Sequence, residues 1–190
     1  MSSDAEPAPG HPARDDQRLH DDLMREYYRL SDIVFDFDQR LVTIKGWGVT
    51  LSLFSLGAGF QQEHYGLFLV AAASGLAFWV VEGVTKIHQM RFYPRMGDIE
   101  AAAYDLYRGQ ATDGPVSSPA INWSWYLSGA RLFGGPVRGD SRVPQRRPEQ
   151  ENRPRWHPLL FPHVALPHLI SAALGTVLFV IGLCGGLGPI

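Results

Sequence analysis

Charge is missing from long parts of the sequence. Between Gly46 and Val81 the only charged residue is Glu63, and residues 169–187 carry no charge at all. All seventeen Lys and Arg side chains lie in two blocks, residues 14–45 and 86–155. A helix of roughly 20 predominantly apolar residues is long enough to cross the hydrocarbon core of a bilayer. The uncharged stretches therefore predict membrane-spanning helices.

Cysteine and catalytic motifs are also scarce. The single Cys184 excludes an intrachain disulfide and a cysteine-based zinc cluster. We find no phosphate-binding glycine loop, no nucleophile elbow and no HExxH motif. The first forty residues are polar and lack the apolar core of a signal peptide. We expect a protein that is not an enzyme and that holds no cofactor.

Three histidines near the C-terminus raise the question of a metal site. His157, His163 and His168 are separated by six and five residues, so one helical face does not stack them. No Cys, Asp or Glu lies in the same segment to complete a ligand set. We interpret them as polar anchors at the membrane interface and expect no metal.

Two apolar legs, residues 43–61 and 66–85, flank a short polar turn and predict a transmembrane helical hairpin. Folding the hairpin at its tip brings Lys45 level with Glu82, and Lys86 follows one helical turn later in the favourable Glu-to-Lys order. We predict a boundary ion pair among these three residues that fixes the register of the hairpin. The alternative is a protonatable or ion-attracting group at a pore mouth.

Small and aromatic residues lie at positions that suit helix packing in a membrane and contact with its interface. Small residues let such helices approach closely, and Trp favours the membrane–water interface. The candidate helix-packing positions are Gly48, Ser52, Ser55 and Gly59 in the first leg, Ala71 and Gly75 in the second, and Gly182 and Gly186 near the C-terminus. The candidate interfacial aromatic residues are Trp47, Trp79 and Trp123.

The segment before the hairpin is amphipathic. Residues 1–13 are Pro-rich and polar and should be disordered, whereas residues 14–45 predict a helix that runs into the first span. Its apolar residues form a heptad-like seam at the lower length limit of a coiled coil. The seam members are Leu23, Tyr27, Leu30, Val34, Phe37, Leu41 and Ile44. The seam packs either within the chain or between copies of it.

The segment after the hairpin, residues 86–133, predicts a cytoplasmic helical region. Pro94 should kink or end the second membrane helix, and a short helix should start after an Asp98 N-cap. Residues 119–133 predict an amphipathic helix, with Ser118 as N-cap, that lies on the membrane or packs on the cytoplasmic helices.

The remaining chain consists of a linker and a third span. Residues 134–156 are rich in Arg and Pro and should be disordered. They lack the interleaved aromatic residues of a nucleic-acid site, so we expect no nucleic acid partner. Residues 166–188 predict the third membrane helix, with Pro167 in its first turn. The expected fold is thus an all-α polytopic membrane protein with cytoplasmic helical extensions.

Both basic blocks should be cytoplasmic by the positive-inside rule. The N-terminus would then be cytoplasmic and the C-terminus outside, in a bacterial inner (plasma) membrane; fifteen Arg against two Lys suggests a GC-rich genome. We expect a homo-oligomeric pore-like or membrane-effector protein whose partners are the lipid bilayer and itself. The alternative is a structural or regulatory subunit whose cytoplasmic helices bind another protein.

Overall fold

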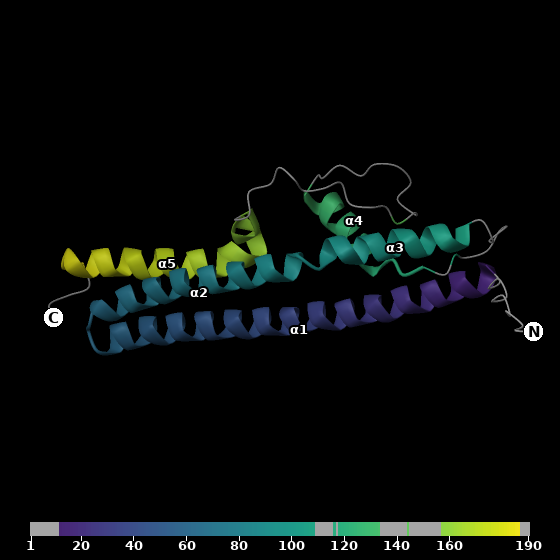
Figure 1. Ribbon diagram of the computed structural model, residues 1–190. Coiled ribbons are helices and arrows are strands. Elements are labelled where there is room, and N and C mark those ends of the chain that lie inside the picture. Colours follow the sequence, from purple (N-terminus) through teal and green to yellow (C-terminus); the bar gives the residue numbers. More distant parts are fainter. Residues whose placement is uncertain (1–11, 109–115, 117, 134–143, 145–156, 187–190) are drawn as a thin grey trace, which may run out of the picture. The chain divides into compact units, whose positions relative to one another are not determined.

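The computed structural model describes residues 12–108, 116, 118–133, 144 and 157–186, and their regular structure is entirely helical (Figure 1). The elements are α1 (Pro12–Gln61), α2 (Gly66–Met90), α3 (Tyr93–Arg108), α4 (Ile121–Phe133), a short 3-10 helix η1 (His157–Leu160) and α5 (Pro162–Leu183). The all-α fold predicted from the sequence is therefore confirmed. The disorder predicted for residues 1–13 and 134–156 falls mostly outside the described residues, but Pro12 and Ala13 already belong to helix α1.

In the part of the chain that the structure describes, three helices are long and apolar enough to cross a membrane. Their candidate spans lie within Arg14–Gln61, Gly66–Arg108 and Pro162–Leu183. The first two are joined by a tight turn in which Glu63 adopts the left-handed conformation, with φ at 54°. The three helices fall at the places where the uncharged stretches predicted them.

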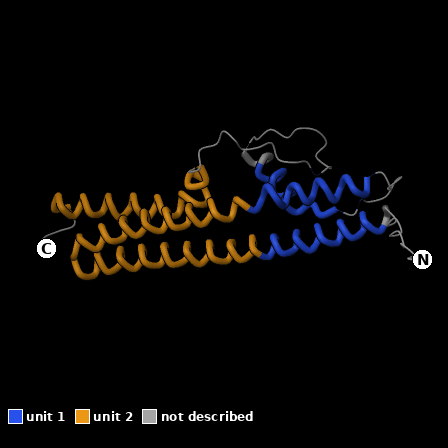
Figure 2. Tube along the Cα trace, viewed as in Figure 1, with its two compact units in different colours: residues 1–32, 92–149 blue, residues 33–91, 150–190 orange. Residues whose placement is uncertain are grey.

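The chain divides into two compact units, and α1 contributes to both (Figure 2). Unit 1 comprises residues 1–32 and 92–149, and unit 2 comprises residues 33–91 and 150–190. Each unit has its own buried interior.

Unit 1 packs the beginning of α1 with α3 and α4. Its buried apolar side chains are Tyr27, Met96, Ile99, Ala101, Ala103 and Trp123. On the surface, the guanidinium of Arg95 donates to both carboxylate oxygens of Glu26, at 2.7 and 2.6 Å. The rings of His20 and Tyr107 meet edge to face at 4.8 Å. These contacts join α1 to α3, and the two helices run antiparallel, as folding the hairpin at its tip predicts.

Unit 2 is built on close packing of α2 against α5, which run side by side in Figure 2. Two glycines make this approach possible. A Cβ at Gly75 would lie 2.9 Å from the carbonyl oxygen of His168, and one at Gly175 would lie 2.6 Å from that of Phe68. Main chain therefore touches main chain at both crossings, which a larger residue would prevent. The apolar core beside them contains Leu56, Tyr65, Phe68 and Ala71.

The seam of α1 is used inside the chain. Tyr27 and Val34 are fully buried and Leu41 is 8 % exposed. Of the two alternatives that the sequence left open, packing within the chain is therefore the one that these residues adopt.

Several helix starts differ from the sequence prediction. Helix α3 begins at Tyr93, six residues before the predicted start, so Asp98 lies inside the helix and is not its N-cap. Helix α5 begins at Pro162, which takes the N-terminal proline position, and Pro167 is inside the helix. Helix α4 begins at Ile121, and the Ser118 hydroxyl donates to the carbonyl oxygens of Glu100 and Pro119 instead of capping. In each case a tertiary contact or an earlier proline displaces the local signal.

Candidate functional site

The candidate site is a group of charged and polar side chains inside unit 2, centred on Glu82 of α2. The Glu82 residue is 1 % exposed. Its Oε1 lies 3.1 Å from the Nζ of Lys45 on α1, and its Oε2 lies 2.8 Å from the Nε2 of His168 on α5. One carboxylate thus links three helices, with a different partner on each oxygen. We call these three residues the Glu82 cluster.

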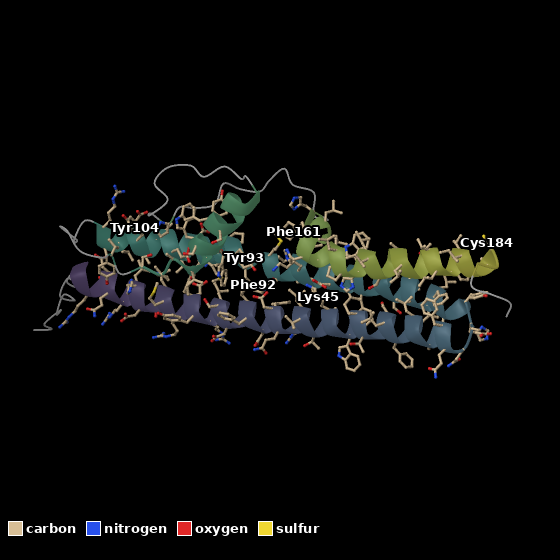
Figure 3. The ribbon with its side chains drawn as sticks, turned by 180° about the vertical axis from the view of Figure 1, so that it is seen from behind. Lys45, Phe92, Tyr93, Tyr104, Phe161 and Cys184 are labelled. Atoms are coloured by element: carbon tan, nitrogen blue, oxygen red, sulfur yellow. The ribbon has the colours of Figure 1, made fainter. Side chains whose placement is uncertain are left out.

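Lys45 also makes a second bond, to a carbonyl that a proline has freed. A helical proline has no N–H, so the carbonyl four residues before it loses its usual partner. In α5 this pairs Pro167 with the carbonyl of His163, and the Nζ of Lys45 donates to that oxygen at 2.8 Å. Figure 3 labels Lys45 on α1. Lys45 therefore satisfies both a buried carboxylate and the open turn of α5.

A second layer of polar groups extends the Glu82 cluster. Lys86, expected in the ion pair with Glu82, donates from Nζ to the Oε1 of Gln89 at 2.6 Å and lies 4.0 Å from the Oδ1 of Asp38. The Nε2 of Gln89 donates to Asp38 at 2.7 Å and to the carbonyl of Val34 at 3.1 Å. Gln89 is fully buried. This layer ties α1 to α2 one turn beyond Glu82.

The predicted helix-packing residues have different roles. Ser52 is buried and donates to the carbonyl of Ala71 at 3.4 Å, and Ser55 is also buried. Gly48 faces Phe78 and His168, Gly59 faces the ring of Phe68, and Gly182 faces the ring of Tyr65. Gly186 lies beyond α5, and a Cβ there would meet only Ile181 of its own segment. Of the two packing positions expected near the C-terminus, Gly182 therefore contacts another segment of the chain, as does Gly175, whereas Gly186 does not.

The three tryptophans differ in environment. Trp47 is 66 % exposed, and Trp79 is half-buried and donates from Nε1 to the carbonyl of Leu159 at 2.9 Å. Trp123 is 5 % exposed and stacks on Tyr126 within unit 1. A ring so enclosed is not presented to lipid, so the interfacial role expected for Trp123 does not fit the structure.

Unit 1 contains a second buried carboxylate, that of Glu100 on α3. It is 1 % exposed and accepts from the Tyr27 hydroxyl at 2.6 Å and from the backbone N–H groups of Asn122 and Trp123 at 2.7 and 2.9 Å. Those two N–H groups open α4, where unpaired donors and the helix dipole favour an anion. Glu100 therefore caps α4 from a neighbouring helix. This places α4 on α3, the second of the two positions that the sequence allowed.

Two side chains of unit 1 have pKa values shifted from their usual range. Burial, and then the hydrogen bond to Glu100, raises the pKa of the Tyr27 hydroxyl well above its usual range. The hydrogen bonds from Arg95 lower the pKa of Glu26. Tyr27 therefore stays a neutral donor to Glu100 at any physiological pH.

Chemically, the Glu82 cluster brings a carboxylate, an ammonium group and an imidazole ring into direct contact. An imidazole is the side chain whose ordinary charge change lies nearest to neutral pH. Among the described residues, no group of three or more His, Cys, Asp or Glu side chains is placed to hold a metal ion.

The sequence pointed to Lys45 and Glu82 but missed His168 and Glu100. His168 was interpreted as an interfacial anchor, although an ionisable residue deep in an uncharged helix usually pairs with another inside the bundle. The signal available in the sequence was its position next to Pro167, because a proline inside a helix leaves a carbonyl without its usual N–H partner and so favours polar contacts with a neighbouring helix. For Glu100 no local signal existed, because its partners are 22 and 23 residues away in the sequence.

Comparison with known proteins provides no relative from which a function could be transferred. No protein-family model matches the chain, and no curated protein or solved structure shows significant similarity to it.

Proposed function

We propose that the chain is an integral membrane protein that assembles from copies of itself and acts on the membrane, as a pore or as a membrane effector. The observation that carries the proposal is the outward-facing apolar surface of unit 2. Phe54 on α1 is 71 % exposed and Leu183 on α5 is 67 % exposed. Further exposed large apolar residues are Leu51, Leu53, Leu69, Val70, Leu76, Val80, Leu166, Ile170, Leu174 and Val177.

This distribution is the reverse of a helical bundle in water. Bundles in water bury their apolar stripe and expose polar residues. In unit 2 the exposed faces carry Leu, Val, Ile and Phe, whereas Ser52, Ser55, Ser74, Glu82 and His168 are buried. Burial of one large apolar side chain is worth about 1.5–3 kcal/mol. Lipid around the three spans would supply that stabilisation on every face.

Self-assembly is supported by the outer face of α1. The small residues first considered for it, Gly48, Ser52 and Gly59, face inward within the chain. Outward, a Cβ at Gly46 or Gly57 would meet nothing within 4 Å, and Thr50 between them is exposed. Membrane helices associate through such small, weakly polar faces. We propose that this face of α1 contacts a second copy or lines a path between copies.

The proposed topology follows the basic residues. The positive-inside rule assigns the ends of the first two membrane spans, near Lys45 and Lys86, to the cytoplasm of a bacterial cell. The turn at residues 62–65 and the end of α5 are then outside. This orientation is part of the proposal.

The second candidate is a structural or regulatory subunit that binds a cytoplasmic protein. One observation favours it: the ionised groups within the spans of unit 2, Lys45 and Glu82, pair with each other inside the chain. A selective ion path usually offers polar groups to the permeating ion. In this alternative, unit 1 would carry the binding surface.

Two measurements on the full-length protein distinguish these candidates. Purified protein in planar bilayers should produce conductance steps, and its particle size in detergent should exceed that of one chain. Gly57→Leu should reduce both, whereas Ala173→Leu, on the exposed face of α5, serves as the matched control. Absence of conductance across voltage and pH would remove the pore, and a monomeric particle that captures one heterologous protein in native membranes would favour the subunit.

A further inference from the structure

The Glu82 cluster has two partners that differ in chemistry. Lys45 carries an ammonium group, whereas His168 carries an imidazole, the type of side chain whose ordinary charge change falls between about pH 5 and 8. Each binds its own oxygen of the same carboxylate, at 3.1 Å for Lys45 and 2.8 Å for His168. We propose that this cluster is a proton-operated switch: proton uptake by His168 transfers the pairing of Glu82 from Lys45 to His168 and loosens α1 from α2 and α5.

The charge balance around Glu82 supports an exchange of partners. With His168 neutral, the charges of Lys45 and Glu82 cancel, and so do those of Lys86 and Asp38, which lie 4.0 Å apart. A proton on His168 adds an uncompensated positive charge in an interior of low dielectric, where such a charge is costly. The positive charge on His168 then repels the ammonium groups of Lys45 and Lys86.

Two other histidines near the Glu82 cluster, His163 and His157, are placed differently from His168. From α5, His163 places its carbonyl on Lys45, but its side chain is exposed. From η1, His157 packs its ring edge to face against Phe161 at 5.1 Å. His168 is the histidine whose ring contacts Glu82, and it is 1 % exposed. It is therefore where an added proton changes the pairing directly.

Lys45 is the partner able to leave. Its side chain is 33 % exposed, against 2 % for Glu82 and 1 % for His168. A Lys ammonium sits on a long flexible stem and reaches water or headgroups easily. Its departure also releases the carbonyl of His163, which the proline in α5 leaves without a helix partner.

The remaining helices should stay together. Close backbone contacts at Gly75 and Gly175 hold α2 to α5 without any charged group. The link of α1 to these helices includes the Lys45 bonds, the bonds of Gln89 and the contact of Ser52 with the Ala71 carbonyl. Acidification therefore moves α1 near Lys45 and leaves the α2–α5 pair unchanged.

Pulsed electron paramagnetic resonance distances test the switch in the full-length protein. Spin labels at Val42→Cys on α1 and Leu166→Cys on α5 use two exposed sites, with the exposed Cys184 replaced by Ser. Distances are measured at pH 8 and at pH 5.5. We expect a second, longer distance that is a minor part of the distribution at pH 8 and becomes its major part at pH 5.5.

Variants test whether His168 and Lys45 cause the change in distance. His168→Gln keeps a donor for Glu82 but cannot become charged, and should show the pH 8 distance at both pH values. Lys45→Gln should show the longer distance already at pH 8. His88→Gln, at an exposed site on α2, should behave as the unmodified protein.

Three results would overturn the switch: one distance at both pH values, an unchanged shift in His168→Gln, or a shift abolished by His163→Gln instead. Dilution of the labelled protein with an excess of unlabelled protein makes the readout a distance within one chain, so loss of conductance would not affect it. If the chain proves soluble, the same labels can be measured in buffer.

Discussion

Replacement of Glu100 by Ala removes the acceptor that positions α4. Three buried donors lose the carboxylate as acceptor: the Tyr27 hydroxyl and the backbone N–H groups of Asn122 and Trp123. The Asn122 N–H also lies 3.4 Å from the hydroxyl oxygen of Tyr27. A buried donor left without a partner costs about 1–3 kcal/mol. Water entering the space left by the side chain would offset part of this. We therefore expect unit 1 to lose on the order of 3–6 kcal/mol, most of it at the docking of α4.

Amide hydrogen exchange of the full-length protein measures this loss where it occurs. Protection of residues 121–133 should fall at least 100-fold in Glu100→Ala, since about 1.4 kcal/mol corresponds to a factor of ten. The matched control is Glu26→Ala, which breaks the surface pair with Arg95; such pairs are worth roughly 0–1 kcal/mol. The capping role of Glu100 would be refuted if both variants changed protection in α4 by the same small factor.

Three further predictions concern packing, pH and a single hydrogen bond. Gly175→Leu should separate α2 from α5, because its side chain would enter the backbone of α2; Ala173→Leu, on the exposed face, should leave the melting temperature in detergent unchanged. The raised pKa of Tyr27 makes a contribution to stability that is complete below the unfolded pKa of about 10 and is lost as the pH rises above it; tyrosinate absorbance should show one late-titrating group, absent in Tyr27→Phe. Trp79→Phe removes the bond to a carbonyl of η1 and should cost about 0.5–1.5 kcal/mol in a denaturation assay.

The helical hairpin could be predicted from the sequence because its signal is local. Absence of charge and a polar turn specify two apolar helices, and the mirror pairing about the turn brings Lys45 to Glu82. Helix starts were harder to predict. A local signal such as Asp98 or Ser118 competes with tertiary partners, and the carboxylate of Glu100 takes the capping role instead.

The third helix of the Glu82 cluster shows what the sequence could not provide. Pairing of α5 with α2 depends on backbone contact at Gly75 and Gly175, and many small residues in the sequence offer similar stripes. Only the register of that crossing brings His168 to Glu82. Once this register is known, the bond from Lys45 to the carbonyl freed by Pro167 also becomes intelligible.

In the proposed protein, lipid surrounds the three long helices of unit 2. Gln62 lies in the exposed turn between α1 and α2. A cysteine introduced there, with Cys184 replaced by Ser, should react with a membrane-impermeant maleimide on intact spheroplasts, whereas a cysteine at the exposed Gln39 should react only after lysis. Reaction at Gln62 only after lysis would contradict the account.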